Sequence, residues 1–215
     1  MAVIHRTTMK PTKGELLNHW LPKQSWYEGD AGGPEPELVN VGGFRLDDPQ
    51  GEVGIEVMVV VDAGAPDPVA YLVPMGYRGA ALEDVPAEAL IGTSEHGVLG
   101  TRWIYDGAHD PVVTAQLRAL LRGEAVAQHP NASDTPDPTV TVHGSDPDDA
   151  GHGGHGGRGG HGHDEPDGRD RDEVRIHRVL RPSEAPQGSS VHLVAGWTWP
   201  DGTSARAVFA TLAPR

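Results

Sequence analysis

Four histidines stand within twelve residues of one another, and three carboxylates follow them. The histidines are His152, His155, His161 and His163, and the carboxylates are Asp164, Glu165 and Asp167. Imidazole nitrogens bind Ni²⁺, Zn²⁺ and Cu²⁺, so a flexible tract of this composition is expected to hold such an ion weakly. A solvated linker is the alternative interpretation. We expect no other cofactor.

Ser94, Glu95 and His96 place a hydroxyl, a carboxylate and an imidazole side by side. Adjacent side chains rarely face one another, and catalytic triads are assembled from distant segments of a chain. The favoured interpretation is therefore a loop whose polar side chains bond its own backbone.

Asp106, His109 and Asp110 offer oxygen and nitrogen ligands for a metal ion. Such a site needs three or more ligands that converge on one point. Asp110, however, precedes Pro111, and an aspartate followed by proline is typical of a helix N-cap. The sequence therefore favours a cap over a metal ligand.

Two glycine motifs resemble nucleotide-binding loops without their required context. Residues 151–156 match the spacing of a dinucleotide fingerprint, but neither a strand nor a helix is expected around them. Residues 92–97 have phosphate-loop spacing, but Val98 and Leu99 stand where lysine and serine or threonine are needed. The chain also has no cysteine, which excludes thiolate chemistry and disulfides. We predict no catalytic residue.

Trp197 and Trp199 lie on one face of an expected strand, together with Val191 and Leu193. Tryptophans on such a face either stack on a sugar ring or pack in a core, and packing is the commoner fate.

The 215 residues include 17 basic and 31 acidic ones, which gives a formal net charge of −14. Phosphate binding needs a basic footprint, so we expect neither nucleic acid nor an anionic membrane as a partner. Neither an apolar run long enough to cross a membrane nor a signal peptide is evident. We expect a soluble cytoplasmic protein.

The elements that must position these residues are mostly strands. Hydrophobic periodicity predicts a short helix over 14–21, stopped by Pro22, and a second helix that starts at Asp110 and ends at Gly123. Apolar or alternating segments predict strands over 38–46, 53–61, 68–77, 99–105, 173–180, 191–199 and 203–212. The sequence thus predicts an α+β fold with a curved antiparallel sheet and two or three packed helices.

Composition divides the chain into three parts. Residues 134–173 hold 11 acidic and 3 basic side chains, and ten glycines stand between Gly144 and Gly168. Such a stretch buries too little apolar surface to offset its ordering entropy, so we expect a disordered linker over 144–172. The ordered parts are then an α+β domain over 1–143 and C-terminal strands over 173–215 that complete or extend its sheet.

Three segments of the first half resemble the N-terminal cap domain of actinobacterial maltokinases. They are Trp20-Leu-Pro-Lys-Gln-Ser-Trp-Tyr27, Asp48-Pro-x-Gly51-x-x-Gly54, and the run from Tyr71-Leu-Val-Pro-Met-Gly-Tyr-Arg78 through Leu90–Gly100 to Asp110-Pro111. The resemblance covers about residues 1–123. One departure is that Ser25 and Glu28-Gly29-Asp30 replace an arginine and Ala-Gly-Lys, so two cations are lost and two acids are gained.

The resemblance implies a cystatin-like fold and a setting in α-glucan (glycogen) and trehalose metabolism. In full maltokinases ATP and maltose bind to a kinase domain that follows the cap, and we find no motif of that domain here. We therefore expect a non-catalytic interaction or regulatory module with a protein partner from this metabolism. Trp20, Trp26 and Tyr27 are the expected contact residues, because aromatic side chains often anchor interfaces. Filling of the core by Trp20 and Trp26 is an equal alternative.

Two other functions stay open. The chain is either a subunit or activator of an ATP-dependent maltokinase, or a metal-handling protein that uses the histidine tract.

Overall fold

A computed structural model describes residues 8–132, 134–144, 172–183 and 190–213. Its helices are α1 (Lys13–Trp20) and α2 (Pro111–Leu121), with short 3₁₀ turns η1 (Leu21–Lys23) and η2 (Ala87–Ala89). Its strands are β1 (Met9–Lys10), β2 (Leu38–Leu46), β3 (Gly54–Asp62), β4 (Ala70–Arg78), β5 (Leu90–His96), β6 (Gly100–Asp106), β7 (Thr141–His143), β8 (Glu173–Ile176), β9 (Val179–Leu180), β10 (Val191–Thr198) and β11 (Ser204–Ala213).

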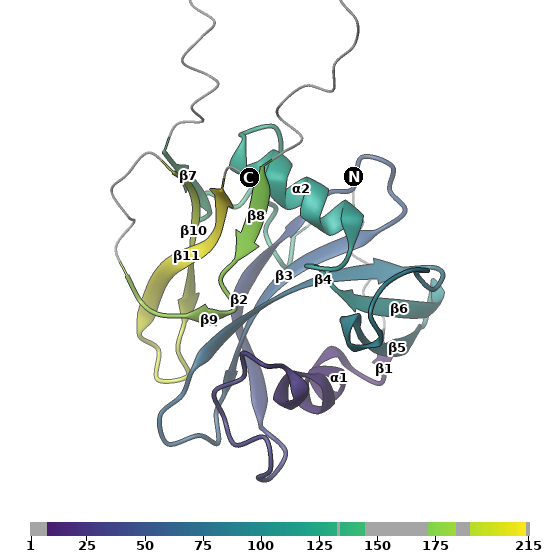
Figure 1. The fold of residues 1–215 in the computed structure, drawn as a ribbon, viewed down its shortest axis with the longest axis vertical. Coiled ribbons are helices and arrows are strands. Elements are labelled where there is room, and N and C mark those ends of the chain that lie inside the picture. The colour runs from purple at the N-terminus through teal and green to yellow at the C-terminus, as the bar shows by residue number, and fades with distance from the viewer. Residues whose placement is uncertain (1–7, 133, 145–171, 184–189, 214–215) are drawn as a thin grey trace, which may run out of the picture.

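The strands of the described residues form one sheet in the order β1-β5-β6-β4-β3-β2-β10-β11-β8, and β7 and β9 pair at its side (Figure 1). Neighbouring strands are antiparallel throughout. The predicted α+β class with a mostly antiparallel sheet and two helices is therefore confirmed. No helix among the described residues has the length and apolar character that crossing a bilayer requires.

The sheet curls until it meets itself. β10 reaches β2 through the pair Trp197 and Gly42, where a Cβ on the glycine would lie 2.9 Å from the tryptophan Cβ. At the far side, β8 pairs with the end of β11 and β9 pairs with the start of β4. The backbone N–H of Leu72 also donates to the Arg178 carbonyl at 2.8 Å. Residues 173–180, hereafter the closing segment, thus complete a ring of strands.

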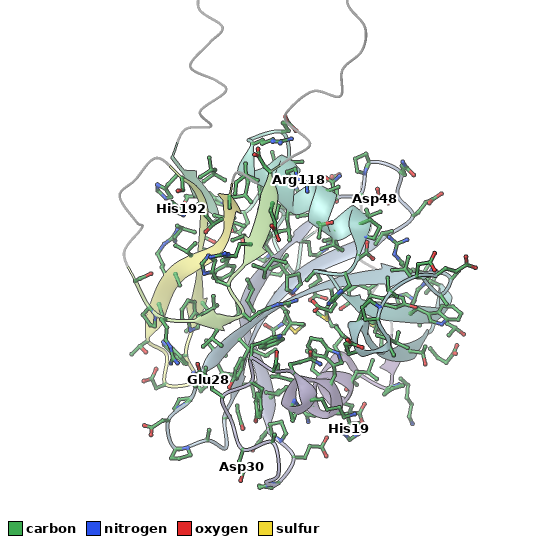
Figure 2. The ribbon with its side chains drawn as sticks, in the orientation of Figure 1. His19, Glu28, Asp30, Asp48, Arg118 and His192 are labelled. Carbon is green, nitrogen blue, oxygen red and sulfur yellow. The ribbon has the colours of Figure 1, made fainter. Side chains whose placement is uncertain are left out.

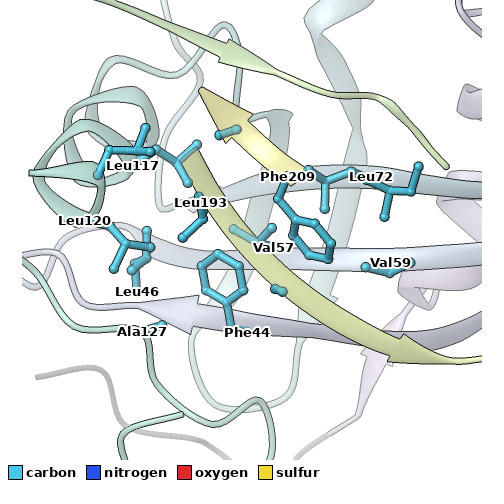
Figure 3. Packing of buried hydrophobic residues seen from close by; sticks show 14 of the residues in the cluster. Phe44, Leu46, Val57, Val59, Leu72, Leu117, Leu120, Ala127, Leu193 and Phe209 are labelled. Atoms are coloured by element: carbon cyan, nitrogen blue, oxygen red, sulfur yellow. The ribbon is translucent and has the colours of Figure 1, made fainter. Parts of the chain in front are cut away.

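The inside of this ring is the larger of two hydrophobic cores (Figure 3). Alternate residues of β3, including Val57 and Val59, point inward, and Phe44 and Phe209 stack with their ring centroids 6.4 Å apart. Leu117 and Leu120 of α2 cap one end of the same core. Each such side chain contributes roughly 1.5–3 kcal/mol when it is fully buried.

The opposite faces of β3 and β4 form the second core, which α1 covers. Its buried members include Leu17 and Trp20 from α1, Met58 from β3, and Tyr71 and Met75 from β4. Both middle strands are consequently buried on both faces, which explains their nearly continuous apolar sequence.

Both helices begin at the caps that their sequences encode. Asp110 accepts hydrogen bonds from the N–H groups of Val112 and Val113, as the Asp-Pro pair predicts. Thr12 and Glu15 form a capping box at the start of α1. The first α-helix ends at Trp20 with Leu21 as its C-cap, directly before Pro22 as predicted, and a 3₁₀ turn then carries the chain through that proline to Lys23.

Two other predictions about the elements were wrong. Residues 94–96 belong to β5 and not to a loop, since they pair with Arg102, Thr101 and Gly100 of β6. The single strand expected over 173–180 is divided into β8 and β9, because its two ends pair with different strands. The linker expected over 144–172 lies outside the described residues, except for its two end positions.

Candidate functional site

The predicted histidine site cannot be placed. His152, His155, His161 and His163 lie outside the described residues. Within residues 8–132, 134–144, 172–183 and 190–213, no group of three histidine or acidic side chains could hold a metal ion. Metal binding by the tract stays a prediction.

The side chains of Ser94, Glu95 and His96 each bond elsewhere. The Ser94 hydroxyl is buried and donates to the Pro11 carbonyl at 2.7 Å. The Glu95 carboxylate accepts from the Thr101 hydroxyl at 2.7 Å. His96 Nδ1 accepts the backbone N–H of Leu99 at 3.0 Å. The Glu95 and His96 contacts lie within the β5–β6 hairpin, the Ser94 contact ties β5 to the segment after β1, and the three side chains do not form a triad.

Asp106 and Asp110 are both bound by arginines. Arg178 Nη2 lies 2.6 Å from each oxygen of Asp106. Arg78 donates from Nε and Nη2 to the two oxygens of Asp110, at 2.6 and 2.7 Å. Both carboxylates are buried, so these ion pairs replace the water that each charge has lost. His109 is exposed and joins neither pair.

The two tryptophans of the C-terminal hairpin differ in exposure. Trp197 is buried in the larger core, and Trp199 packs against it edge-on with ring centroids 5.5 Å apart. Trp199 is half-buried and lines a cavity of about 330 Å³ between the β3–β4 and β10–β11 turns. Core packing thus accounts for Trp197.

Trp20, Trp26 and Tyr27 lie at the end of α1 and in the segment after it. Trp20 is buried, and its indole N–H donates to the Glu88 carbonyl at 2.8 Å. Trp26 contacts Trp20 edge-on at 5.8 Å, and Arg178 lies 5.1 Å above its ring. Tyr27 lies 5.4 Å from the ring of Tyr71. The structure therefore joins the three predicted contact residues in one aromatic cluster, with only Trp26 and Tyr27 partly exposed.

Beside this cluster is a cavity of about 480 Å³, hereafter the tyrosine cavity. One wall is the segment that follows α1 and the other is the turn between β3 and β4, at the lower end of the molecule in Figure 2. It is lined by Tyr27, Glu28, Gly29, Asp30, Pro34, Glu35, Pro36, Glu37, Asp62, Gly64, Ala65, Pro66, Asp67, Val69 and Tyr71. Six of these residues are acidic and none is basic.

Local hydrogen bonds fix the two walls of the tyrosine cavity. The Tyr71 hydroxyl accepts the Glu28 N–H at 3.1 Å. Asp62 Oδ1 accepts the N–H groups of Glu37 and Gly64, at 3.0 and 3.1 Å, and so joins the two walls directly. The cavity is consequently a property of the fold and not of one flexible loop.

The tyrosines of the cavity are held in their neutral form. Burial raises the pKa of Tyr27, and the negative charge of Asp62 adds to the effect. Burial also raises the pKa of Tyr71, in spite of the hydrogen bond from the Glu28 N–H. The half-buried ring of Tyr27 is therefore neutral beside the carboxylates of the cavity, and the buried ring of Tyr71 packs against it.

The aromatic cluster and the cavity fall inside the region that a known family shares. Residues 20–110 match the maltokinase N-terminal cap domain. This match confirms the resemblance seen in the sequence, and it spans β2–β6 and the residues that line the tyrosine cavity. The cap match does not reach β8, β9, β10 or β11, which complete the ring. No curated protein matches the chain.

Sequence reasoning missed the tyrosine cavity, although it found one of its walls. The acids Glu28 and Asp30 were noted as departures from the cap pattern, and both line the cavity. Asp62 and Asp67 lie more than thirty residues away in the chain, and the pairing of β2 with β3, in which Leu38 faces Asp62, brings their turn to the same place.

Proposed function

We propose that this chain is a non-catalytic interaction or regulatory module of α-glucan and trehalose metabolism, which acts on a protein partner in the cytoplasm. The observation that carries the proposal is the cap match over residues 20–110. The cystatin-like arrangement implied by the family is part of the same proposal.

The state of the polar side chains supports a binding role. Asp106, Asp110 and Ser94 hold the fold together, because their oxygens bond to arginines or to the backbone. The tyrosine cavity, in contrast, offers the neutral ring of Tyr27 and several carboxylates to whatever enters it. Aromatic side chains in a preformed hollow are typical anchors of protein interfaces.

Purification of the tagged full chain from its native host tests the proposal. We expect mass spectrometry to identify an enzyme of α-glucan or trehalose metabolism bound to the wild-type chain. Tyr27→Ala should reduce its recovery, since Tyr27 lines the cavity. Val126→Ala is the control, because Val126 is exposed and does not line it. Failure to recover any such enzyme with the wild-type chain would contradict the proposal.

An assay of ATP-dependent maltose phosphorylation separates regulation from catalysis. We expect no turnover by the purified chain alone. A higher rate when the chain is added to a co-purified maltokinase would assign it the role of an activator. Turnover by the unaided chain would refute the non-catalytic assignment.

A further inference from the structure

The tyrosine cavity has one kind of charge and one kind of apolar surface. Its six acidic residues come from the segment after α1 and from the β3–β4 turn, and Tyr27 and Tyr71 supply its rings. Its volume of about 480 Å³ lies within the range of known ligand pockets. A guest that fits must therefore be matched to both features.

Two of the carboxylates can accept further hydrogen bonds. The side chains of Glu37 and Asp67 are exposed at the cavity, and neither has a hydrogen bond or ion pair with the described residues. Glu28, Asp30 and Asp62 already have partners, but each ionised carboxylate has room for more than one donor. Carboxylates that share a hollow also repel one another, and a bound cation relieves this repulsion.

The chain itself shows which cation suits this region. Arg178 lies over the Trp26 ring while its guanidinium binds Asp106. Arg181 forms an ion pair with Glu28, which lines the tyrosine cavity. Both arginines belong to the C-terminal part of the chain, and they reach back to Trp26 and Glu28 in the segment after α1. One guanidinium held between a ring and a carboxylate thus lies beside the aromatic cluster, and a second binds a carboxylate that lines the cavity.

We propose that the tyrosine cavity receives a lysine or arginine side chain from a basic segment of a protein partner. The inference rests on the proposed interaction function and gives the partner its chemistry. The cation lies against the ring of Tyr27, where the aromatic quadrupole attracts it, and its N–H groups donate to Glu37 and Asp67.

Two other guests fit the same observations less well. A sugar could stack on Tyr27 and donate from its hydroxyls to the carboxylates, but because it is neutral it would leave their mutual repulsion in place. A metal ion needs three ligands at one point, and no such group occurs among the described residues.

Titration of the full chain with small probes tests the proposal. The probes are N-acetyl-arginine amide, N-acetyl-lysine amide, the neutral isostere N-acetyl-citrulline amide, and maltose. Binding is followed by ¹H–¹⁵N correlation spectra, with the amides of Glu28 and Gly64 as reporters in the two walls. We expect saturable shifts with the two cationic probes and none with citrulline amide, and the affinity should fall as salt is raised.

A pair of isosteric substitutions tests the residues. Glu37→Gln with Asp67→Asn removes two charges without breaking a hydrogen bond of the described chain, and should weaken binding of the arginine probe at least about threefold. Glu83→Gln with Glu124→Gln changes the net charge equally at exposed positions outside the cavity, and should leave the affinity unchanged.

Three results would overturn the inference: equal shifts with citrulline amide, shifts with maltose alone, or equal affinity in the two double variants.

Co-purification distinguishes failure of this inference from failure of the proposed function. If both double variants recover the same metabolic enzyme as the wild-type chain, the interaction function stands and the cavity is not its contact. If no enzyme is recovered but the probes bind selectively, the cation site stands and the proposed function fails.

Discussion

At the scale of single residues, Asp110 carries two structural roles with one carboxylate. It caps α2 through Val112 and Val113, and it binds Arg78 of β4 through both oxygens. Its side chain is fully buried, so the charge is stable there only because Arg78 accompanies it. The same residue therefore starts the helix and fixes the helix to the sheet.

We predict that Asp110→Ala lowers the free energy of unfolding by roughly 3–5 kcal/mol, because it leaves Arg78 largely buried without its partner and removes the cap. Asp110→Asn should cost less, since an amide oxygen still caps the helix. Urea unfolding followed by circular dichroism measures both values. A loss below about 1 kcal/mol for the alanine variant would show that the pair is unimportant.

His177 gives the stability a dependence on pH. Burial, and then the charges of Arg175 and His192, lower its pKa below the ordinary value of 6.5. The unfolded chain therefore binds a proton at higher pH than the folded chain does. The contribution of His177 to stability is complete above pH 6.5 and is lost as the pH falls through the lower, folded pKa.

We predict that His177→Gln reduces the loss of stability between pH 7 and the acid range. Glutamine is chosen because its amide can still reach the Thr211 hydroxyl, which lies 2.8 Å from His177 Nε2. The measurement is the free energy of unfolding in urea at a series of pH values. His109→Gln is the control, because His109 is exposed. Equal pH profiles for the wild-type chain and the His177 variant would contradict the assignment.

At the scale of elements, the closing segment connects strands that are distant in the sequence. Its first half pairs with β11 and its second half with β4, and Arg178 at the junction binds the buried Asp106 at the end of β6. Three parts of the sheet thus depend on eight consecutive residues.

We predict that Arg178→Ala destabilises the protein by roughly 3–5 kcal/mol, because it leaves the Asp106 charge buried without a partner. Arg181→Ala is the matched control on the same part of the chain. Its side chain is 65% exposed, so the loss should stay below about 1 kcal/mol. Urea unfolding monitored by tryptophan fluorescence measures the free energy of unfolding of both variants. Trp26 serves as a reporter, because Arg178 lies over its ring. Equal effects of the two substitutions would refute the special role of Arg178.

Most of the elements could be predicted from the sequence because their patterns are local. β2, β3 and α2 follow from hydrophobic spacing and from the Asp110-Pro111 cap. β5 was missed because only Ile91 and Ser94 are buried among its last six residues, which include Gly92, Thr93 and Glu95. The division at His177 was missed because it depends on Asp106 and Leu72, which lie far away in the chain.

At the scale of the whole molecule, the domain predicted over 1–143 does not contain the whole of the larger hydrophobic core. Nine of the twenty-three buried residues of the larger core lie beyond residue 143. They include Leu180, Trp197 and Phe209, and Phe209 stacks on Phe44 of β2. Removal of the C-terminal strands would therefore expose one face of the middle strands to water.

We predict that a fragment of residues 1–143 shows no cooperative unfolding transition, because it cannot bury Phe44 and its neighbours. The control is the full chain in which 145–171 is replaced by a glycine-serine linker of equal length, and it should unfold with the wild-type midpoint. Circular dichroism and fluorescence in urea measure both. A sharp transition in the fragment would show that 1–143 folds independently and would contradict this prediction.

The candidate site was predictable only in part, because residues far apart in the sequence come together in it. Trp26 and Tyr27 were found because aromatic residues stand out in a sequence. Their partner Tyr71, and the acids of the β3–β4 turn, join them only through tertiary packing. Exposure could not be predicted either, since Trp20 is buried while its near neighbour Trp26 is not.

Closure of the ring by residues 173–180 bears on how the protein would fail under stress. If that segment detached first, stretches of β4 and β11 would offer unsatisfied N–H and C=O groups to other chains. Exposed strand edges of this kind act as templates for aggregation. Resistance to aggregation in a concentrated solution would then depend on how firmly these eight residues stay paired with β4 and β11, more than on the free energy of unfolding of the whole fold.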